Sequence, residues 1–245
     1  DFETIVIDDC STDNSFDIAS NHPLKNKTVL RNDKNLERCL TRNKGILESK
    51  GQYICFIDSD DYHLPIHLER LKNLISESKT KKAFFFTNSF DETEEGIRTE
   101  RTCPQIKNKN IYTYLMRYTI NPQRWAVHSE VIKTCLFDEN INICEDLDVS
   151  LRIACTGVPF IQLFEPTTVY VHASDSFTSS DPNKNEREYG CYKKIFSRPE
   201  LQNILPLKNK NRLLSKCHYF FALKAHDNEQ NLKTLKHIIL SFFLY

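Results

Sequence analysis

The stretch that most constrains this chain is an apolar run that ends in acids, Tyr53–His63. Residues 53–57 are β-branched, aromatic or otherwise apolar apart from the small Cys55, which is the composition and length of a buried parallel strand. Three carboxylates follow at once: Asp58, Asp60 and Asp61. Because open α/β sheets bind ligands at the carboxyl ends of their strands, we expect these acids to lie in a crevice.

Three carboxylates within four residues repel one another unless a cation lies between them. Mg²⁺ accepts one or two carboxylates and completes its shell with water and phosphate oxygens. The acids therefore predict a divalent metal with a bound phosphate group. A solvated acidic turn is the alternative that the three residues leave open by themselves.

Composition narrows the class of protein. A length of 245 residues suits one large α/β domain, or one domain plus a helical appendage. The formal net charge is zero, so no overall basic field indicates nucleic acid. Nine cysteines, an odd number with no CxxC pair, favour a reduced intracellular protein over a disulfide framework or a zinc site. No GxGxxG or P-loop occurs, and no apolar stretch reaches 18 residues.

Strand-like and helix-like segments alternate along the first part of the chain. Strands are expected at residues 2–7, 28–30, 53–57, 83–87, 124–127 and 169–172. Helices are expected at 13–21, 36–49, 65–78, 111–119, 129–132 and 145–154, and throughout the region after 185. The polar segment 89–110 is expected to be an irregular surface excursion. This alternation predicts an α/β fold with a mostly parallel sheet flanked by helices.

Four segments of the sequence occur together in an order and spacing typical of a known family: Thr4–Ser15, Arg42–Ile46, Gly51–Asp61 and Glu145–Arg152. Together they closely resemble the family 2 glycosyltransferases with a GT-A fold, which build bacterial surface polysaccharides. The resemblance implies a GT-A (Rossmann-like) domain over residues 1–180 and a helical C-terminal extension over 181–245. It also implies that the first strand and helix of the family are missing before residue 1. Two residues depart from the family pattern: Cys10 stands where the family often has glycine, and Glu37 stands near a common glycine after Asn35.

The resemblance places a nucleotide-diphosphate sugar, with UDP the expected nucleotide, on Asp8, Asp9, Arg42 and Asp58. Asp8 and Asp9 leave a strand end beside a helix N-terminus, where a carboxylate can accept a hydrogen bond from the imide N–H of uracil. Arg42 would lie near the base or the phosphates, and Asp58 would hold the ribose. A helix cap and a solvated helix charge are the structural alternatives for these residues.

The remaining roles also follow from the resemblance. Asp60, with help from Asp58, would bind Mg²⁺ or Mn²⁺, and His172 would be a third protein ligand or touch the diphosphate. Asp146 matches the general base, and Glu145 would help to place the acceptor. We expect the helix N-terminus to keep Asp146 ionised at pH 7. Because the metal neutralises the leaving diphosphate, no catalytic acid is needed.

The sequence therefore favours an inverting, metal-dependent glycosyltransferase that acts on a glycan or lipid-linked acceptor in the cytoplasm. Two alternatives remain. A sugar-1-phosphate nucleotidyltransferase would need a glycine-rich phosphate loop after its first strand. A non-catalytic nucleotide- or glycan-binding scaffold would not need to retain all the acids. The Lys-rich, apolar tail 207–245 suits either a peripheral contact with the inner membrane leaflet or a helical cap on the domain.

Overall fold

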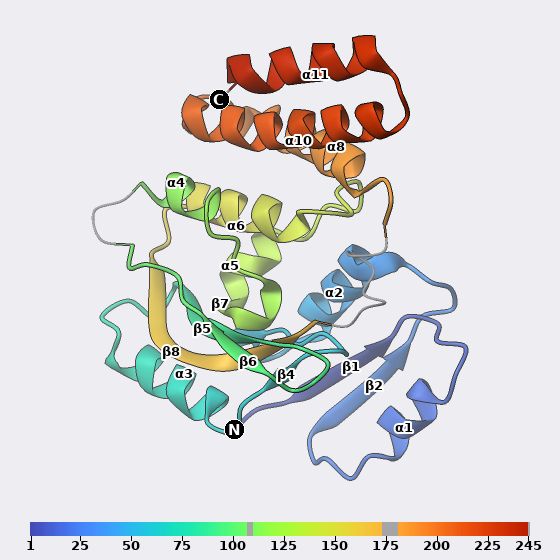
Figure 1. Cartoon of the computed structure of the whole chain (residues 1–245). Coiled ribbons are helices and arrows are strands. Elements are labelled where there is room, and N and C mark those ends of the chain that lie inside the picture. The colour runs from blue at the N-terminus through green and yellow to red at the C-terminus, as the bar shows by residue number, and fades with distance from the viewer. Residues whose placement is uncertain (107–109, 173–180, 245) are drawn as a thin grey trace.

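The computed structural model describes residues 1–106, 110–172 and 181–244 and shows an α/β fold with a curled sheet and a helical C-terminal region (Figure 1). The chain begins with a small βαβ unit. Strands β1 (Thr4–Asp8) and β2 (Lys27–Arg31) pair in parallel, and helix α1 (Ser15–Asn21) connects them. Helix α2 (Glu37–Glu48) follows and packs against β1.

A larger, six-stranded sheet forms the centre of the molecule. Its order is β3-β7-β5-β8-β4, and β6 pairs with β5 outside this path. The strands are β3 (Tyr53–Cys55), β4 (Tyr62–His63), β5 (Phe84–Glu92), β6 (Arg98–Arg101), β7 (Trp125–His128) and β8 (Phe160–Val171). The register between β5 and β8 shifts on both sides of Asn88, which donates a hydrogen bond to the Phe164 carbonyl. Such irregularities bend a strand, and β8 is visibly curved in Figure 1.

The α/β class and the helical C-terminal region agree with the sequence prediction, but the expected mostly parallel sheet is wrong. Among the described strands, β1–β2 and β5–β8 pair in parallel, whereas β3–β7, β5–β7, β5–β6 and β4–β8 are antiparallel. Alternating strands and helices indicate crossovers, yet they do not reveal in which direction each strand enters the sheet.

The predicted buried parallel strand at residues 53–57 also needs correction. β3 is a three-residue antiparallel strand at the end of the strand order, and its ladder ends where Cys55 pairs with Ala126. The residues before β7 form a short 3-10 helix, Pro122–Arg124, so no strand lies opposite Ile57 to extend the ladder. Ile57 consequently lies 54% exposed, just before the acidic turn.

Residues 89–106, the described part of the predicted excursion 89–110 apart from residue 110, contain more regular structure than predicted; residues 107–109 lie outside the described ranges. β5 continues to Glu92 and forms an antiparallel hairpin with β6. The hairpin turns through Gly96, whose positive φ of 79° favours glycine. All four residues of β6 are exposed and polar, which explains why an apolar pattern did not reveal this strand.

The core lies on both faces of β5. Phe84 and Phe86 point into the main core together with Trp125, and Phe85 points into a smaller cluster under helix α3 (His67–Glu77) with Leu71. This alternation is the two-residue period of a strand buried on both faces. Short helices α4 (Ile111–Leu115) and α5 (Ser129–Thr134) and the longer α6 (Glu145–Cys155) cover the main core.

The C-terminal helices pack on the side of α6 away from the sheet (Figure 1). They are α8 (Lys184–Phe196), α9 (Pro199–Gln202), α10 (Leu207–Asp227) and α11 (Asn231–Leu244). Ile195, Leu213 and Cys217 join the main core, and Asn209 donates to the Thr113 carbonyl of α4. The predicted domain boundary at 180/181 adjoins residues outside the described ranges and stays a prediction. In the part of the chain that the structure describes, no helix combines the length and hydropathy needed to cross a membrane.

Candidate active site

Arg42 joins two of the acidic segments that the sequence singled out. Its Nη2 donates to both oxygens of Asp58, at 2.8 and 2.9 Å, and its Nη1 lies 3.0 Å from Oε1 of Glu145. Asp58 lies in the turn after β3, and Glu145 opens α6. The helix α2 thus brings together residues that are more than 80 positions apart in the sequence, and its Arg42 side chain is only 12% exposed.

The neighbouring residues hold the guanidinium in place. It lies over the ring of Phe137, 5.5 Å from the centroid. Asn43 holds the backbone of Phe137, because its amide donates to the Phe137 carbonyl and accepts from the Phe137 N–H, both at 2.8 Å. Burial opposes the charge of Arg42, but Asp58 and Glu145 outweigh it and raise the pKa of Arg42 above its ordinary value. The site is therefore built around a permanently charged cation.

Arg38 is a second cation at this site and was missed by the sequence analysis. Its Nη1 lies 3.4 Å from the same Oε1 of Glu145. Arg38 and Arg42 are four residues apart and so lie on one face of α2, a spacing that could have paired them from the sequence. Glu145 therefore contacts two arginines, while Asp58 contacts one of them.

Asp146, the predicted base, is half-buried beside Glu145 in the first turn of α6. Burial and the charge of Glu145 raise the pKa of Asp146 to about 7, against the opposing effects of the Leu147 N–H and Arg42. This corrects the expectation that the helix N-terminus keeps the group fully ionised at pH 7. A carboxyl group with a pKa near neutrality is well suited to accept a proton at pH 7 and above.

Besides Asp58, the acidic turn contains Asp61, which accepts hydrogen bonds from the protein, and Asp60, for which none is found among the described residues. Asp61 is buried: it accepts hydrogen bonds from Gln123 Nε2 at 2.7 Å and from the Val171 N–H at 2.9 Å. Burial, and then the charges of Asp60 and Asp58, raise the pKa of Asp61 to about 6. Asp60 is exposed, and no hydrogen bond or ion pair to it is found within the described ranges. Nothing in the sequence could have indicated the role of Gln123.

Asp8 and Asp9 are both occupied by local contacts at the end of β1. The buried Asp8 accepts from the Ser11 N–H and pairs with Arg31 at 3.2 Å. Asp9 accepts from Asn32 and from the Leu36 N–H, each at 2.8 Å. Burial acts against its ionisation, but these hydrogen bonds prevail and hold the pKa of Asp9 below its ordinary value. Asp9 therefore stays ionised, and both residues line up the turns that precede α1 and α2. Their predicted contact with uracil stays a prediction.

The two departures from the family pattern have a structural counterpart. Cys10 and Glu37 both have a φ of +65°, the left-handed region that glycine adopts most easily. Cys10 directly follows Asp9. Glu37, the first residue of α2, directly follows Leu36, whose N–H donates to Asp9, and its own N–H donates to the Asn35 side chain. Two side chains thus stand where the backbone itself favours glycine.

His172 lies just beyond β8, at the same edge of the sheet as Asp61. Its backbone N–H donates to the Glu92 carbonyl, and its ring Nε2 lies 3.2 Å from Asp91. Among the described residues, no three His, Cys, Asp or Glu side chains are grouped as metal ligands would be. The structure thus does not bring His172 together with Asp58 and Asp60 in a three-residue site.

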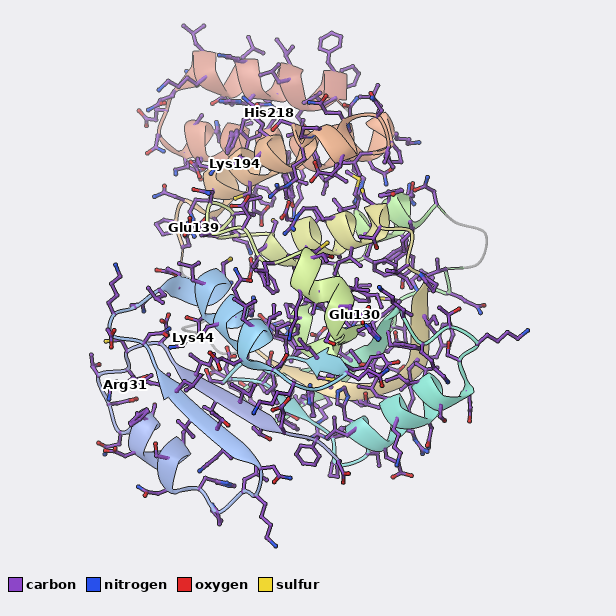
Figure 2. All side chains as sticks on the ribbon, turned by 180° about the vertical axis from the view of Figure 1, so that it is seen from behind. Arg31, Lys44, Glu130, Glu139, Lys194 and His218 are labelled. Carbon is purple, nitrogen blue, oxygen red and sulfur yellow. The ribbon has the colours of Figure 1, made fainter. Side chains whose placement is uncertain are left out.

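A polar cavity of about 510 Å³ adjoins the site at Arg38. It lies between the start of α2 and the loop that carries Glu139, which Figure 2 labels on the side of α2 that faces the C-terminal helices. Charged and amide side chains line most of it: Glu37, Arg38, Glu139, Asn140, Asn142 and Arg187. The arrangement offers donors and acceptors to a hydroxyl-rich molecule next to Glu145.

Comparisons with known proteins show the family to which the chain belongs. The glycosyl transferase family 2 profile matches residues 1–135. An uncharacterized glycosyltransferase of Methanocaldococcus jannaschii is 26% identical over 64% of this chain and 55% of its own length. A putative colanic acid biosynthesis glycosyl transferase of Escherichia coli is 28% identical over 79% of this chain and 70% of its own.

The structure of Staphylococcus aureus TarS (residues 1–349), in complex with UDP-GlcNAc, shares the fold with a TM-score of 0.68. It is 19% identical, and the match covers 97% of this chain and 70% of that one. The fold is therefore that of the GT-A glycosyltransferases. The chain belongs to glycosyl transferase family 2, and it spans about half the length of the archaeal relative.

Proposed function

We propose that this chain transfers a sugar from a UDP-sugar to a hydroxyl group of a glycan or lipid-linked acceptor, with inversion at the anomeric carbon. The observation that carries the proposal is the Arg42 bridge, which holds Asp58 of the acidic turn and Glu145 of α6 in one site. Asp146, with a pKa of about 7, lies next to Glu145. A donor side and a base side thus meet at a single buried cation.

The choice of donor rests on fold and chemistry together. TarS, which shares the fold, was determined with UDP-GlcNAc bound. The residues proposed for the nucleotide are Asp8 and Asp9 at the end of β1, Asp58 after β3, and Arg42 on α2. Carboxylates accept hydrogen bonds from the imide of uracil and the hydroxyls of ribose, whereas Arg42 complements phosphate.

A divalent cation fits the acidic turn. Asp60 has no protein partner within the described residues, and the charges of Asp58 and Asp60 raise the pKa of Asp61. This excess of negative charge suits Mg²⁺ or Mn²⁺, which needs only one or two protein carboxylates when a diphosphate supplies further oxygens. The ion would be held by Asp60 with Asp58, and it would stabilise the charge of the departing diphosphate.

The protein groups supply the remaining chemistry. The acceptor oxygen forms a bond to the anomeric carbon as the bond from that carbon to the diphosphate oxygen breaks, and UDP leaves. The acceptor proton passes to the ionised carboxylate of Asp146. Glu145, paired with Arg38 and Arg42, cannot turn freely and is placed to orient the acceptor. The attack comes from the side opposite the leaving group, which gives inversion.

The acceptor side is the polar cavity beside Arg38. Its charged and amide lining suits sugar hydroxyls better than an apolar substrate. The colanic-acid name of the E. coli relative fits the same class of acceptor. We therefore place this chain in the assembly of a polysaccharide, with the glycan or its lipid carrier as acceptor.

The proposal is tested by incubating the protein with Mn²⁺, a panel of UDP- and GDP-sugars and glycan acceptors, and by measuring released nucleotide diphosphate. We expect UDP release that depends on the acceptor and is lost in Asp146→Asn. Pyrophosphate exchange between UTP and a sugar-1-phosphate would instead support a nucleotidyltransferase. Tight UDP-sugar binding without turnover, for every acceptor of the panel, would contradict the proposal and favour a binding scaffold.

A further inference from the structure

Helix α11 carries its apolar side chains on the outside of the molecule. It forms the outermost layer in Figure 1, and none of its described residues is buried. Leu232 is 86% exposed, and Phe242 and Phe243 are each 79% exposed. With Leu235, Ile238 and Ile239 they recur at a spacing of three to four residues, so they form one stripe along the helix. A surface helix normally turns such a stripe inward.

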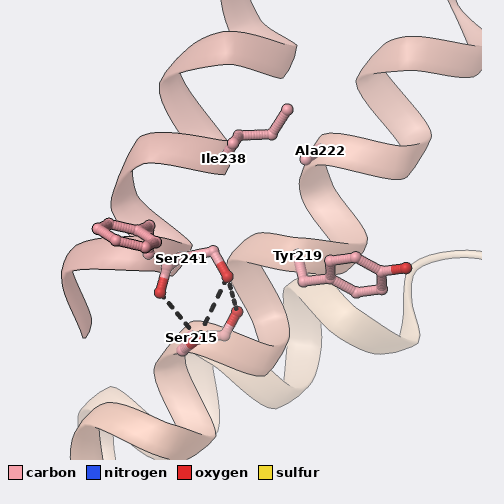
Figure 3. Close-up of a pocket in the computed structure, with 6 residues that line it drawn as sticks. Ser215, Tyr219, Ala222, Ile238 and Ser241 are labelled. Atoms are coloured by element: carbon pink, nitrogen blue, oxygen red, sulfur yellow. Dashed lines mark hydrogen bonds between the residues drawn. The ribbon is translucent and has the colours of Figure 1, made fainter. Parts of the chain in front are cut away.

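The face that packs on α10 is the more polar one. His237 and His218 approach each other at 3.1 Å between their Nδ1 atoms. Ser241 and Ser215 exchange hydrogen bonds with each other's carbonyl oxygens at 2.9 and 3.1 Å (Figure 3). Leu240 and Leu244 are the half-buried apolar side chains on this face. The helix is thus inverted relative to the usual pattern, and its orientation is fixed by specific polar contacts.

The apolar stripe continues onto α10. A cavity of about 560 Å³ opens between the two helices, lined by Ser215, Tyr219, Ala222, Ile238, Ser241 and Phe242 (Figure 3). Tyr219 and Leu223 of α10 are also exposed. Stripe and cavity together form a contiguous apolar surface, which we call the α10–α11 face. Surfaces of this kind on otherwise polar molecules mark an interaction site.

Charge identifies the partner. Residues 207–245 contain seven basic side chains (Lys208, Lys210, Arg212, Lys216, Lys224, Lys233 and Lys236) and two acidic ones (Asp227 and Glu229). The whole chain has a net charge of zero, so the rest of it carries the compensating acidic excess. Lys233 and Lys236 lie exposed on α11 itself, which has no acidic residue. A second copy of this face would bring like charges together, which opposes self-association.

We propose that the α10–α11 face docks on an anionic lipid bilayer, with the stripe of α11 in the interface and the lysines against the headgroups. An amphipathic helix with phenylalanine and leucine on one side and lysine beside them binds membranes in this way. The inference does not depend on the proposed transferase activity, because membrane binding is measured without substrate. It would place the protein at the surface where lipid-linked acceptors are found.

The experiment is flotation of the full chain with vesicles of phosphatidylcholine alone or of phosphatidylcholine with phosphatidylglycerol. We expect the parent to float with the anionic vesicles only and to be released by salt. Phe242→Ser/Phe243→Ser should weaken the vesicle affinity about a hundredfold, because two side chains lose their apolar insertion. Lys233→Gln/Lys236→Gln should weaken it about thirtyfold.

Ile18→Ser/Ile97→Ser is the matched control, since both isoleucines are more than 60% exposed far from the α10–α11 face. It should float as the parent does. Circular dichroism and thermal melting of each variant show that the fold is retained. Equal flotation with neutral and anionic vesicles, or parent-like flotation of the double Phe variant, would overturn the proposal. So would self-association of the parent that the Phe variant abolishes, because the face would then be an interface between copies.

Discussion

Two carboxylates three residues apart in α6 each contact two arginines, but the number of other acids around those arginines differs. Glu145 belongs to the site, where Arg38 and Arg42 meet a larger number of acids. Asp148 has a side chain only 1% exposed and lies between Arg152 and Arg198, at 2.9 and 2.6 Å. Both residues are acids in the first turn of one helix, so position alone does not distinguish them.

The difference is the balance of charge. Around Asp148 the two arginines are matched by two acids, because Arg198 also pairs with Asp138 at 2.6 Å. In the site, no Lys, Arg or His side chain within the described ranges is in contact with Asp60 or Asp146. A balanced buried network ties α6 to the C-terminal helices, whereas an unbalanced one leaves groups available for a ligand. Functional sites commonly depart from the rules that stabilise the rest of a fold.

The largest expected effect is on catalysis at Asp146. Asp146→Asn keeps the shape and removes the basicity, so the transfer rate should fall about 10²- to 10⁴-fold. Donor affinity, measured by calorimetry with a UDP-sugar, should stay nearly unchanged because the base meets the acceptor. A variant that transfers at close to the parent rate would make Glu145 the next candidate.

Thermal melting sharpens this result. The folded-state pKa of Asp146 is raised, so its ionisation costs stability once the pH exceeds the unfolded value of 3.8. Asp146→Asn should therefore melt at a slightly higher temperature than the parent at pH 8. A clearly lower melting temperature would mean that Asp146 is mainly structural.

The next effect is on stability at Asp148. Asp148→Asn leaves Arg152 and Arg198 without their buried partner and should destabilise the fold by about 3–5 kcal/mol. Urea unfolding measures this loss. Asp138→Asn is the matched control: its carboxylate is partly exposed, so we expect less than about 1 kcal/mol. Equal losses in the two variants would show that burial of Asp148 does not set it apart from Asp138.

A smaller effect concerns pH. Because Asp146 must be ionised to accept a proton and its pKa is about 7, kcat/KM should fall about tenfold for each pH unit below 6 and level off above 8. Glu145→Gln removes a charge that raises this pKa, so the profile should move to lower pH. A rate that stays constant from pH 8 down to pH 5 would exclude Asp146 as the titrating base.

The smallest effect lies at the two left-handed residues. Cys10→Gly and Glu37→Gly should each stabilise the protein by about 0.5–1 kcal/mol, since relief of backbone strain exceeds the added entropy of the unfolded chain. Urea unfolding would show the gain. Asn26→Gly, at a φ of 56°, is the control and should gain less, because asparagine tolerates this region.

The sequence predicted the elements whose signals are local. The acidic turn after β3 and the apolar run of β5 were found from apolar composition, and the helix that opens with Glu145 from its acidic start. The directions of the strands were not, because pairing depends on contacts between distant segments. The polar hairpin strand β6 has no apolar pattern to reveal it.

For the site, too, the sequence identified individual residues but not the contacts between distant segments. The acids could be named, but the contact of Arg42 with both Asp58 and Glu145 joins segments on different elements. The support of Asp61 by Gln123 has no sequence signal at all. The raised pKa of Asp146 comes from burial and from Glu145, which a helix-start argument based on the sequence does not weigh.

The most direct test of the unbalanced site is nucleotide binding by Asp60→Ala. Titration of UDP into the parent protein by calorimetry should show binding that requires Mn²⁺, because the excess carboxylates need a cation before they accept a diphosphate. Asp60→Ala should lose this metal-dependent binding while it melts at the same or a slightly higher temperature, since one repelling charge is gone. If Asp60→Ala binds UDP and Mn²⁺ as the parent does, the acidic turn is not the metal site and the account is contradicted.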